Sequence, residues 1–412
     1  MKTLYLCYFG LREPLVQTQV LPYLRELAAS GVEVHLLTFE REMRQKWSEQ
    51  SRAEEITRLA GRGISWSALP YHKRPSVPAT LFDIIAGAWT ALRLVRRNHI
   101  DVIHARAHIP LAMILILRRL TQCFLVFDIR GLMAEEYADA GVWTTDSLKF
   151  KAIKWLERAG LKRAHQIVVL TRAMSDWLVE KGYASSDKIE VIPCCVDFAR
   201  YSDAQCLDKT EESRFEIVYA GSVTGLYLLE EMAAFFSALR VQEPRAFFRI
   251  LTMSPADEVS ARLRRFGLEP EQYWVGEVSA QEVPRSLRRA RLGVSFRKPT
   301  FSQIASSPTK IPEYLAAGLP VVSNAGIGDV DSLLERERVG VVIKDFTPAE
   351  LARAARAAYD VSRDVDVRER CVDVARRYFD LKTVGAQGYL NVYRRIGEAL
   401  NARQSMSEAA SD

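Results

Sequence analysis

The chain has 412 residues, of which 48% are hydrophobic and 26% are charged. This length and balance predict a folded protein of two or three domains and exclude a largely disordered chain. The net charge of +6 is concentrated in the first half, because residues 1–200 carry 28 basic and 21 acidic side chains and the remainder carries 29 and 30.

The first half predicts a parallel α/β domain over residues 1–197. Apolar strands rich in Val and Ile alternate with amphipathic helices, a pattern typical of βαβ units. The expected strands are Thr3–Phe9, Val32–Phe39, Ile100–Ala105, Phe124–Ile129, Gln166–Leu170 and Ile189–Ile192, and the expected helices are Thr18–Ala29, Leu81–Arg97, Pro110–Leu120 and Ser147–Ala164.

Polar side chains follow the expected strands of this half. Asp128 could orient or deprotonate an acceptor hydroxyl, and Arg130 could hold an anionic group. A mutual ion pair between Asp128 and Arg130 is the structural alternative. The carboxyl ends of parallel strands meet at one edge, so we expect the other polar residues to share this rim and bind the acceptor. They are Gln17, His104, Arg106 and His108.

A polar segment, residues 198–213, predicts a linker, and a second α/β domain follows over residues 214–380. Its expected strands are Phe215–Ala220, Ala246–Met253, Tyr273–Val275, Leu292–Phe296, Pro320–Ser323 and Gly340–Ile343, and its expected helices are Leu229–Val241, Val259–Phe266, Ala280–Ala290, Lys310–Ala317 and Pro348–Tyr359. We expect a C-terminal helix over residues 381–400 to pack back toward the first domain. Residues 401–412, which are small and polar, predict a flexible tail.

The most informative segment runs from Ser306 to Val322 and reads SSPTKIPEYLAAGLPVV. Ser307 or Thr309 can cap the helix, and the helix start suits a diphosphate. Lys310 adds a cation there. One turn further on, the Glu313 carboxylate can accept hydrogen bonds from both ribose hydroxyls. A plain capped helix packed on the sheet is the alternative.

The EYLAAGLPVV segment, preceded by SPTK, resembles the donor-nucleotide motif of family 4 (group 1) glycosyltransferases. The resemblance implies a GT-B fold: two doubly wound Rossmann-like domains that face a central cleft. It further implies that Glu313 binds the ribose, that the helix start binds the phosphates, and that the sugar is transferred with retention. Gly221 and Ser222, after the first strand of the second half, belong to the same donor site.

The sequence departs from this family at two places. Most members carry a further glutamate eight positions before Glu313, where this chain has Ala305. Backbone amides near Ile304–Ser306 are the alternative contact for the sugar. Family members also place an Arg and a Lys after the glycine, and residues 223–227 contain neither. Arg297 and Lys298 could substitute there, with a solvated basic turn as the alternative.

We therefore expect a metal-independent glycosyltransferase that moves a sugar from a UDP- or GDP-sugar to a saccharide or lipid-linked acceptor in polysaccharide or glycoconjugate biosynthesis. The rivals are a nucleotide-sugar 2-epimerase and a catalytically inactive binding subunit. No cofactor is expected beyond the donor substrate, and no nucleic-acid partner. The Asp-x-Asp steps at 329–331 and 364–366 are not expected to bind metal.

The cysteines and the charge predict the location. None of the six cysteines has zinc-site or redox spacing, which is typical of reduced thiols in a cytoplasmic protein. The basic half suits an anionic membrane or a lipid-phosphate acceptor, with an ordinary solvated surface as the alternative. The preferred membrane contact is one face of the helix Leu81–Arg97, unless that face is core. The face holds Leu81, Ile84, Ile85, Ala88, Leu92 and Val95, with Arg93, Arg96 and Arg97 at its end.

Overall fold

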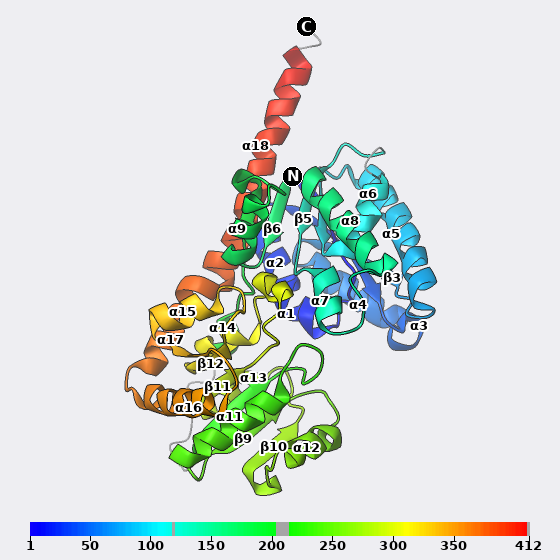
Figure 1. The fold of residues 1–412 in the computed structure, drawn as a ribbon. Coiled ribbons are helices and arrows are strands. Elements are labelled where there is room, and N and C mark those ends of the chain that lie inside the picture. Colours follow the sequence, from blue (N-terminus) through cyan, green and yellow to red (C-terminus); the bar gives the residue numbers. More distant parts are fainter. Residues whose placement is uncertain (118–119, 203–213, 410–412) are drawn as a thin grey trace. The chain divides into compact units, whose positions relative to one another are not determined.

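The computed structural model describes residues 1–117, 120–202 and 214–409. The chain divides into two compact units, each with its own parallel sheet (Figure 1). Unit 1 comprises Met1–Ala138, Trp143–Pro193 and Leu381–Asp412, and unit 2 comprises Asp139–Val142 and Cys194–Asp380. Most of the predicted linker, residues 203–213, lies outside the described residues.

Unit 1 is built on a seven-stranded sheet in the order β3-β2-β1-β4-β5-β6-β7. Every neighbouring pair is parallel; Leu4 of β1, for example, lies opposite His35 of β2 and Ile103 of β4. The central strands are covered on both faces, which explains their continuous apolar runs. The strands are β1 Lys2–Cys7, β2 Glu33–Glu40, β3 Ile64–Pro70, β4 Val102–Arg106, β5 Phe124–Asp128, β6 Gln166–Val169 and β7 Ile189–Val191.

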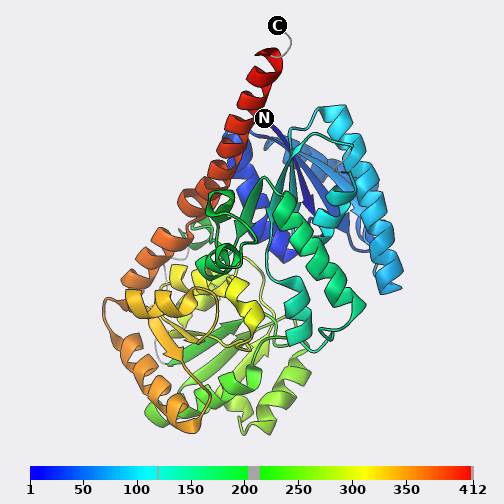
Figure 2. The same cartoon turned by 45° about the horizontal axis from the view of Figure 1, so that its top comes forward.

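Helices cover both faces of this sheet (Figure 2). Right-handed crossovers place α5, α6, α8 and α9 on one face and α2 and α4 on the other. The C-terminal helix α18 packs against α2 and β7. The helices are α1 Pro14–Gln19, α2 Leu21–Ala29, α3 Met43–Lys46, α4 Glu49–Ala60, α5 Ser76–Asn98, α6 His108–Leu117, α7 Met133–Asp139, α8 Leu148–Arg163, α9 Arg172–Glu180, η1 Ser186–Lys188, η5 Leu381–Ala386 and α18 Gln387–Ala409.

Unit 2 repeats this plan on a six-stranded parallel sheet in the order β10-β9-β8-β11-β12-β13. Its strands are β8 Glu216–Ala220, β9 Phe247–Leu251, β10 Tyr273–Gly276, β11 Leu292–Ser295, β12 Val321–Asn324 and β13 Gly340–Ile343. Its helices are α10 Ala199–Ser202, α11 Leu229–Gln242, α12 Ala256–Arg265, η3 Pro270–Gln272, α13 Val283–Arg289, η4 Phe301–Ala305, α14 Lys310–Ala316, α15 Val330–Glu337, α16 Pro348–Arg363 and α17 Val367–Phe379.

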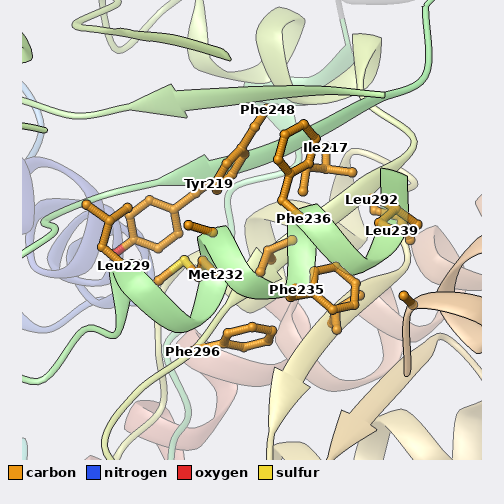
Figure 3. Packing of buried hydrophobic residues seen from close by; sticks show 14 of the residues in the cluster. Ile217, Tyr219, Leu229, Met232, Phe235, Phe236, Leu239, Phe248, Leu292 and Phe296 are labelled. Carbon is orange, nitrogen blue, oxygen red and sulfur yellow. The ribbon is translucent and has the colours of Figure 1, made fainter. Parts of the chain in front are cut away.

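Aromatic side chains fill the core of unit 2 between α11 and the sheet (Figure 3). Phe235 and Phe236 project from α11, and both are completely buried. Phe235 meets Phe296 edge to face with ring centroids 5.8 Å apart, and Phe236 meets Phe248 at 5.5 Å. This packing fixes α11 against β9 and against the residue that follows β11, and the carboxyl ends of β8 and β11 carry the donor-site candidates.

The structure contains elements that the sequence reading did not predict. The edge strand β3 was not predicted; it is half exposed, and serines alternate with Ile64 and Trp66 along it. Helix α17 lies between the two helices expected to close the chain. The residues 401–409, predicted as a flexible tail, continue α18 to Ala409. They contain no glycine or proline that would end a helix.

Helix α5 is, within the described part of the chain, the one helix long and apolar enough to cross a membrane by length and composition. Its inner side nevertheless packs in the protein, where Gly87, Ala88 and Ala91 are buried. Asp83, the only acidic residue of the helix, also points inward. It accepts a hydrogen bond from the Tyr8 hydroxyl at 2.7 Å and pairs with His72 at 2.6 Å.

Candidate functional site

The donor-site candidates of unit 2 meet at the carboxyl ends of β8 and β11 and at the start of α14. Gly221 follows β8 with a φ of +135°. A side chain there would approach Cε and Nζ of Lys310 to 3.3 Å. A larger residue would thus have a strained backbone and would also crowd the lysine, which explains why this position is a glycine. The structure therefore brings together Gly221 and Lys310, which are distant in the sequence.

Lys310 is a buried cation that forms no ion pair with a carboxylate of the described residues. Its residue is only 5% exposed, and its ammonium lies 4.0 Å from the ring centroid of Tyr227 and 5.1 Å from that of Tyr219. Burial lowers the pKa of Lys310 and Arg297 lowers it further, whereas Tyr227 and, more weakly, Glu313 oppose the shift. Among the described residues, no carboxylate lies within salt-bridge distance of the Lys310 ammonium.

Arg297 shares the Tyr227 ring with Lys310. Its guanidinium carbon lies 4.7 Å from the ring centroid, and its Nε donates to Gln303 Oε1 at 2.6 Å. Lys310 and then Arg297 lower the pKa of the Tyr227 hydroxyl, although burial opposes them. Arg297 too lacks a carboxylate partner in the described ranges. Two cations therefore converge on one tyrosine, and none of the described carboxylates forms an ion pair with either of them, an arrangement suited to an anionic ligand.

Glu313 lies one turn after Lys310 on α14, and its side chain is 21% exposed. Arg200, which the sequence did not identify, places its Nη1 3.4 Å from Glu313 Oε1 and donates from Nη2 to the Ala280 carbonyl at 3.1 Å. Burial raises the pKa of Glu313, while Arg200 and Lys310 oppose that shift. The carboxylate predicted to bind ribose is thus held by a partly exposed arginine.

The remaining predicted donor residues lie around this group with different partners. Thr309 occupies the N-cap position of α14, but its side chain makes no capping hydrogen bond. Ser307 does not cap the helix either, because its hydroxyl accepts from the Cys194 amide at 3.1 Å. Capping by either side chain was therefore a wrong expectation. The Ser222 hydroxyl is exposed and lies 3.1 Å from that of Thr224.

Lys298 lines an open cavity of about 770 Å³, to which Tyr227 also contributes. Thr224, Gly225 and Arg262 belong to the same lining. The Lys298 amide donates to the Leu226 carbonyl at 2.9 Å, so the backbone of this loop is fixed. Lys298 and Tyr227 therefore share this cavity, and Arg297 contacts the Tyr227 ring.

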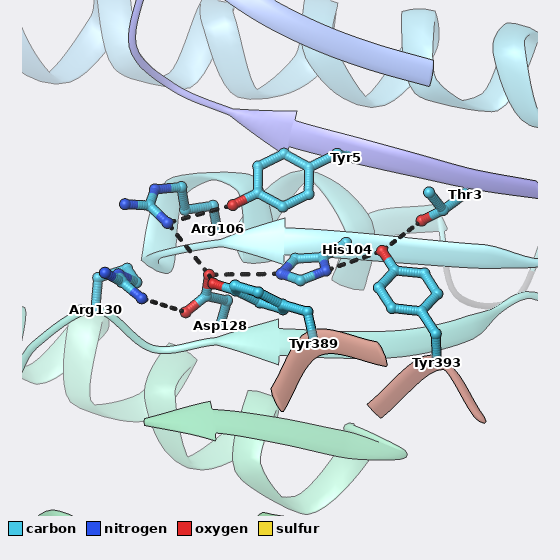
Figure 4. A network of polar contacts seen from close by, with 8 residues as sticks. All are labelled: Thr3, Tyr5, His104, Arg106, Asp128, Arg130, Tyr389 and Tyr393. Carbon is cyan, nitrogen blue, oxygen red and sulfur yellow. Dashed lines mark hydrogen bonds and ion pairs between the residues drawn. The ribbon is translucent and has the colours of Figure 1, made fainter. Parts of the chain in front are cut away.

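In unit 1 four of the predicted site residues, His104, Arg106, Asp128 and Arg130, belong to one largely buried network (Figure 4). Asp128, at the end of β5, is completely buried. Its carboxylate lies 3.3 Å from Arg106 Nη1 and 3.5 Å from Arg130 Nη1. It also accepts from the Tyr389 hydroxyl of α18 at 2.9 Å and lies 3.5 Å from Nε2 of His104.

The network continues from His104 to two further side chains. His104 Nδ1 lies 3.1 Å from the Tyr393 hydroxyl, which in turn lies 2.9 Å from Thr3 Oγ1. Burial lowers the pKa of His104, and the neighbouring Asp128 only partly offsets this. The imidazole is therefore a neutral link between β4 and α18.

Burial alone would raise the pKa of Asp128, but Arg130, His104 and Arg106 together hold it far below its usual range. A carboxylate so strongly stabilised as an anion is a weak base, and it offers no surface to a substrate. The geometry therefore favours the structural alternative, in which Asp128 and Arg130 form an ion pair.

The expected common rim is found only in part. His104 and Arg106 join Asp128, but His108 is 1% exposed and turns to Glu157, whose carboxylate lies 3.2 Å away. None of these three side chains offers surface to an acceptor in this arrangement. Gln17 is exposed on α1, where its amide donates to the Leu11 carbonyl at 2.6 Å.

The described residues contain no group of three or more His, Cys, Asp or Glu side chains that could hold a metal ion. In the first Asp-x-Asp step, Asp331 accepts from the Gly326 amide at 2.7 Å; in the second, Asp364 pairs with Arg370 at 2.7 Å. Both acids thus serve local structure.

Comparison with known families identifies both units. Residues 16–195 match the model of the glycosyl transferase 4-like domain, and residues 214–360 match that of the glycosyl transferases group 1. The chain is a glycosyltransferase of this group. The resemblance stated from the EYLAAGLPVV segment is confirmed. The search of functionally characterised proteins by sequence gave no match.

Solved structures confirm the GT-B fold of this glycosyltransferase. Sucrose-phosphate synthase from Thermosynechococcus elongatus matches with a TM-score of 0.73 and 14% identity, over 97% of this chain and 99% of that one. Anabaena Alr3699/HepE in complex with UDP-glucose matches with a TM-score of 0.67 and 16% identity, over 98% of this chain and 100% of that one. WaaG, a glycosyltransferase involved in lipopolysaccharide biosynthesis, matches with a TM-score of 0.65 and 14% identity, over 95% of this chain and 98% of that one.

Proposed function

We propose that this glycosyltransferase takes its sugar from a UDP- or GDP-sugar bound at the Lys310–Arg297 corner of unit 2. The observation that carries the proposal is the pair of cations that converge on Tyr227, neither of which pairs with a carboxylate among the described residues. A nucleotide diphosphate would supply the missing negative charge. The similar HepE structure contains UDP-glucose, which makes UDP-sugars the first donors to test.

In the proposed reaction the bond between the anomeric carbon and the diphosphate oxygen breaks, and a bond to an acceptor hydroxyl oxygen forms. Negative charge grows on the leaving diphosphate, and Lys310 and Arg297 stabilise it where it develops. The acceptor proton leaves with the diphosphate or passes to solvent. In this proposal the ribose hydroxyls replace Arg200 as the hydrogen-bond donors to Glu313.

Further residues of unit 2 have supporting roles in this proposal. Gly221 leaves room for a phosphate beside Lys310, and the hydroxyls of Ser222, Ser307 and Thr309 are candidate donors to its oxygens. Ala305 is completely buried and brings no carboxylate to the sugar. We therefore expect backbone amides near it to contact the sugar, and retention of configuration stays a family-based expectation.

We further propose a saccharide or lipid-linked acceptor bound by unit 1, in polysaccharide or glycoconjugate biosynthesis at the inner face of a membrane. WaaG, which has the same fold, acts in lipopolysaccharide biosynthesis. Because His104 and Arg106 lie in the buried network and His108 pairs with buried Glu157, the acceptor candidates that remain are exposed Gln17 and the partly buried Arg130.

A donor panel tests the proposal. Purified protein is incubated with UDP- and GDP-sugars, with and without saccharide acceptors, and free nucleotide and sugar products are quantified. We expect nucleotide release with one donor class, which disappears in Lys310→Met. Epimerised donor without transfer would instead support the epimerase, and binding without turnover would support an inactive subunit.

A further inference from the structure

The outer side of the helix layer α5–α6–α8 in unit 1 carries large apolar side chains in solvent. On α5, Ile85 is 65% and Trp89 71% exposed. On α8, Leu148 is 84% and Trp155 67% exposed. Helix α6 packs between α5 and α8 and adds Ile116. Single exposed apolar residues are ordinary, but a set on adjacent helices marks an interaction surface.

The stripe on α5 follows the helical repeat. Leu81, Ile85 and Trp89 are spaced by four residues, and Phe82 lies beside the first of them. The contact face expected from the sequence was only partly right, because Ala88, Leu92 and Val95 are buried against the sheet. The burial pattern therefore moves the exposed face to Leu81, Phe82, Ile85 and Trp89.

Basic residues surround these apolar side chains, and acids are turned away. The exposed cations flank α5 at both ends and follow α8: Lys73, Arg74, Arg93, Arg96, Arg97, Lys149, Lys151, Arg158 and Lys162. The only acids of α5 and α8 are Asp83 and Glu157, which are both buried, and α6 has none. Glu157 is held inside by Lys154 at 2.5 Å.

These facts distinguish the surface from an ordinary solvated one. A soluble face usually mixes both charge signs. Within α5, α6 and α8 the exposed charges are all basic and lie among aromatic and aliphatic side chains, the composition of helices that lie in a membrane interface; the exposed acid Asp146 lies just before α8. Tryptophan is the residue best suited to that depth, because its ring is apolar and its N–H is polar.

We propose that the outer faces of α5, α6 and α8 form a membrane-docking surface that binds bilayers containing acidic lipid. The apolar side chains Leu81, Phe82, Ile85, Trp89 and Trp155 enter the headgroup boundary, and the flanking cations contact acidic headgroups. The use of this surface rests on the proposed function, since it would keep unit 1 next to a lipid-linked acceptor. The binding itself does not depend on catalysis.

Co-sedimentation of the full-length protein with liposomes tests the surface. Vesicles of phosphatidylcholine alone are compared with vesicles that contain phosphatidylglycerol, at low and high salt. We expect binding to require the acidic lipid. It should also fall as salt rises, because exposed charges are screened over about 8 Å at physiological ionic strength.

Two variants separate the apolar and the charged contributions. Ile85→Ser/Trp89→Ser should weaken binding at every salt concentration. Arg93→Gln/Arg96→Gln/Arg97→Gln should weaken it more than tenfold at low salt, since each cation near an acidic surface contributes roughly fivefold. The matched controls are Val241→Ser/Val365→Ser, which are 78% and 90% exposed in unit 2, and Arg264→Gln/Arg265→Gln on α12. The controls should bind like the wild type.

Further measurements keep the outcomes distinct. Thermal melting must be unchanged in each variant, as expected for exposed positions, and light scattering reports self-association. Equal binding to neutral and acidic vesicles, or equal binding by the α5 variants and the controls, would overturn the proposal. Dimerisation that Ile85→Ser/Trp89→Ser abolishes would also overturn the proposal, because the partner of this surface would then be a second copy of the chain. UDP binding in solution is measured separately, so a missing donor site would overturn the proposed function and leave this surface standing.

Discussion

Replacing Lys310 with Met should weaken donor binding without destabilising the protein. Methionine keeps an unbranched side chain of similar length and removes the charge. Lys310 is 5% exposed and has no acidic partner among the described residues, so its ammonium loses hydration and gains little in return. An essential structural residue would behave in the opposite way.

The magnitude follows from two opposing contributions. Real proteins lose several kcal/mol when an ion is buried without compensation, and the variant recovers part of this. It loses the cation–π contacts with Tyr227 and Tyr219, which contribute roughly 0.5–2 kcal/mol. We therefore expect the free energy of unfolding of the ligand-free protein to stay the same or to rise by up to about 3 kcal/mol.

The dependence on pH has a definite sign. The pKa of Lys310 is lowered in the folded protein below its ordinary value of 10.5. The unfolded chain thus binds this proton more tightly, and wild-type stability rises relative to Lys310→Met as pH increases through the folded pKa toward 10.5. The advantage of the variant should accordingly be largest at neutral pH and shrink in alkali.

Donor affinity should change in the other direction. A hydrogen bond to a charged group contributes about 1.5–3 kcal/mol, which corresponds to roughly 10- to 150-fold in Kd. Calorimetric titration with UDP and GDP measures it, urea unfolding measures stability, and Lys344→Met, an exposed lysine of unit 2, is the control. Unchanged nucleotide affinity, or a loss of more than about 1 kcal/mol of stability, would refute the reasoning.

Three further predictions concern other groups. Glu313→Gln should lower nucleotide affinity by about 1.5–3 kcal/mol and leave the fold intact, because an amide is a poorer partner for two ribose hydroxyls; calorimetry that shows no change would remove Glu313 from the site. Asp128→Asn should cost about 3–5 kcal/mol of stability in urea unfolding at neutral pH, because Arg106 is left buried without its counter-charge. The pKa of Asp128 is depressed, so its contribution is present above 3.8 and is lost as pH falls toward the folded pKa; a stable but inactive variant would instead restore its catalytic role. Transferase activity should survive EDTA, and loss of activity that Mg²⁺ or Mn²⁺ reverses would contradict metal independence.

The sequence predicted most of the sheets because their strands are covered on both faces. A central strand such as Leu4–Cys7 must be apolar throughout. The edge strand β3 was missed because one side is exposed, so that serines alternate with Ile64 and Trp66. Helix α17 was missed because its charged residues hide a narrow apolar stripe of Val367, Cys371 and Val374.

The candidate donor site around Lys310 was partly predictable because short sequence segments contain several of its residues. Lys310 and Glu313 are one turn apart on a helix, and Gly221 ends a strand. Arg200 and Tyr227 could not be predicted, since only tertiary packing brings them to α14. The same limit affected unit 1, where Asp128 ends a strand and was expected to be accessible. Tyr389, 261 residues later in the chain, covers it.

The two units treat buried charge differently, and this difference separates structure from function. In unit 1, Asp128 is surrounded by Arg106, Arg130 and two hydrogen-bonding rings, so its charge is balanced within the protein. In unit 2, Lys310 and Arg297 repel each other, and neither forms an ion pair with a carboxylate of the described residues; Glu313 offsets the charge of Lys310 only weakly. A folded protein retains such an imbalance at a cost, and a diphosphate would remove it by binding. We therefore expect opposite outcomes when a buried charge is neutralised: Asp128→Asn destabilises the ligand-free protein, whereas Lys310→Met mainly weakens the complex with the nucleotide.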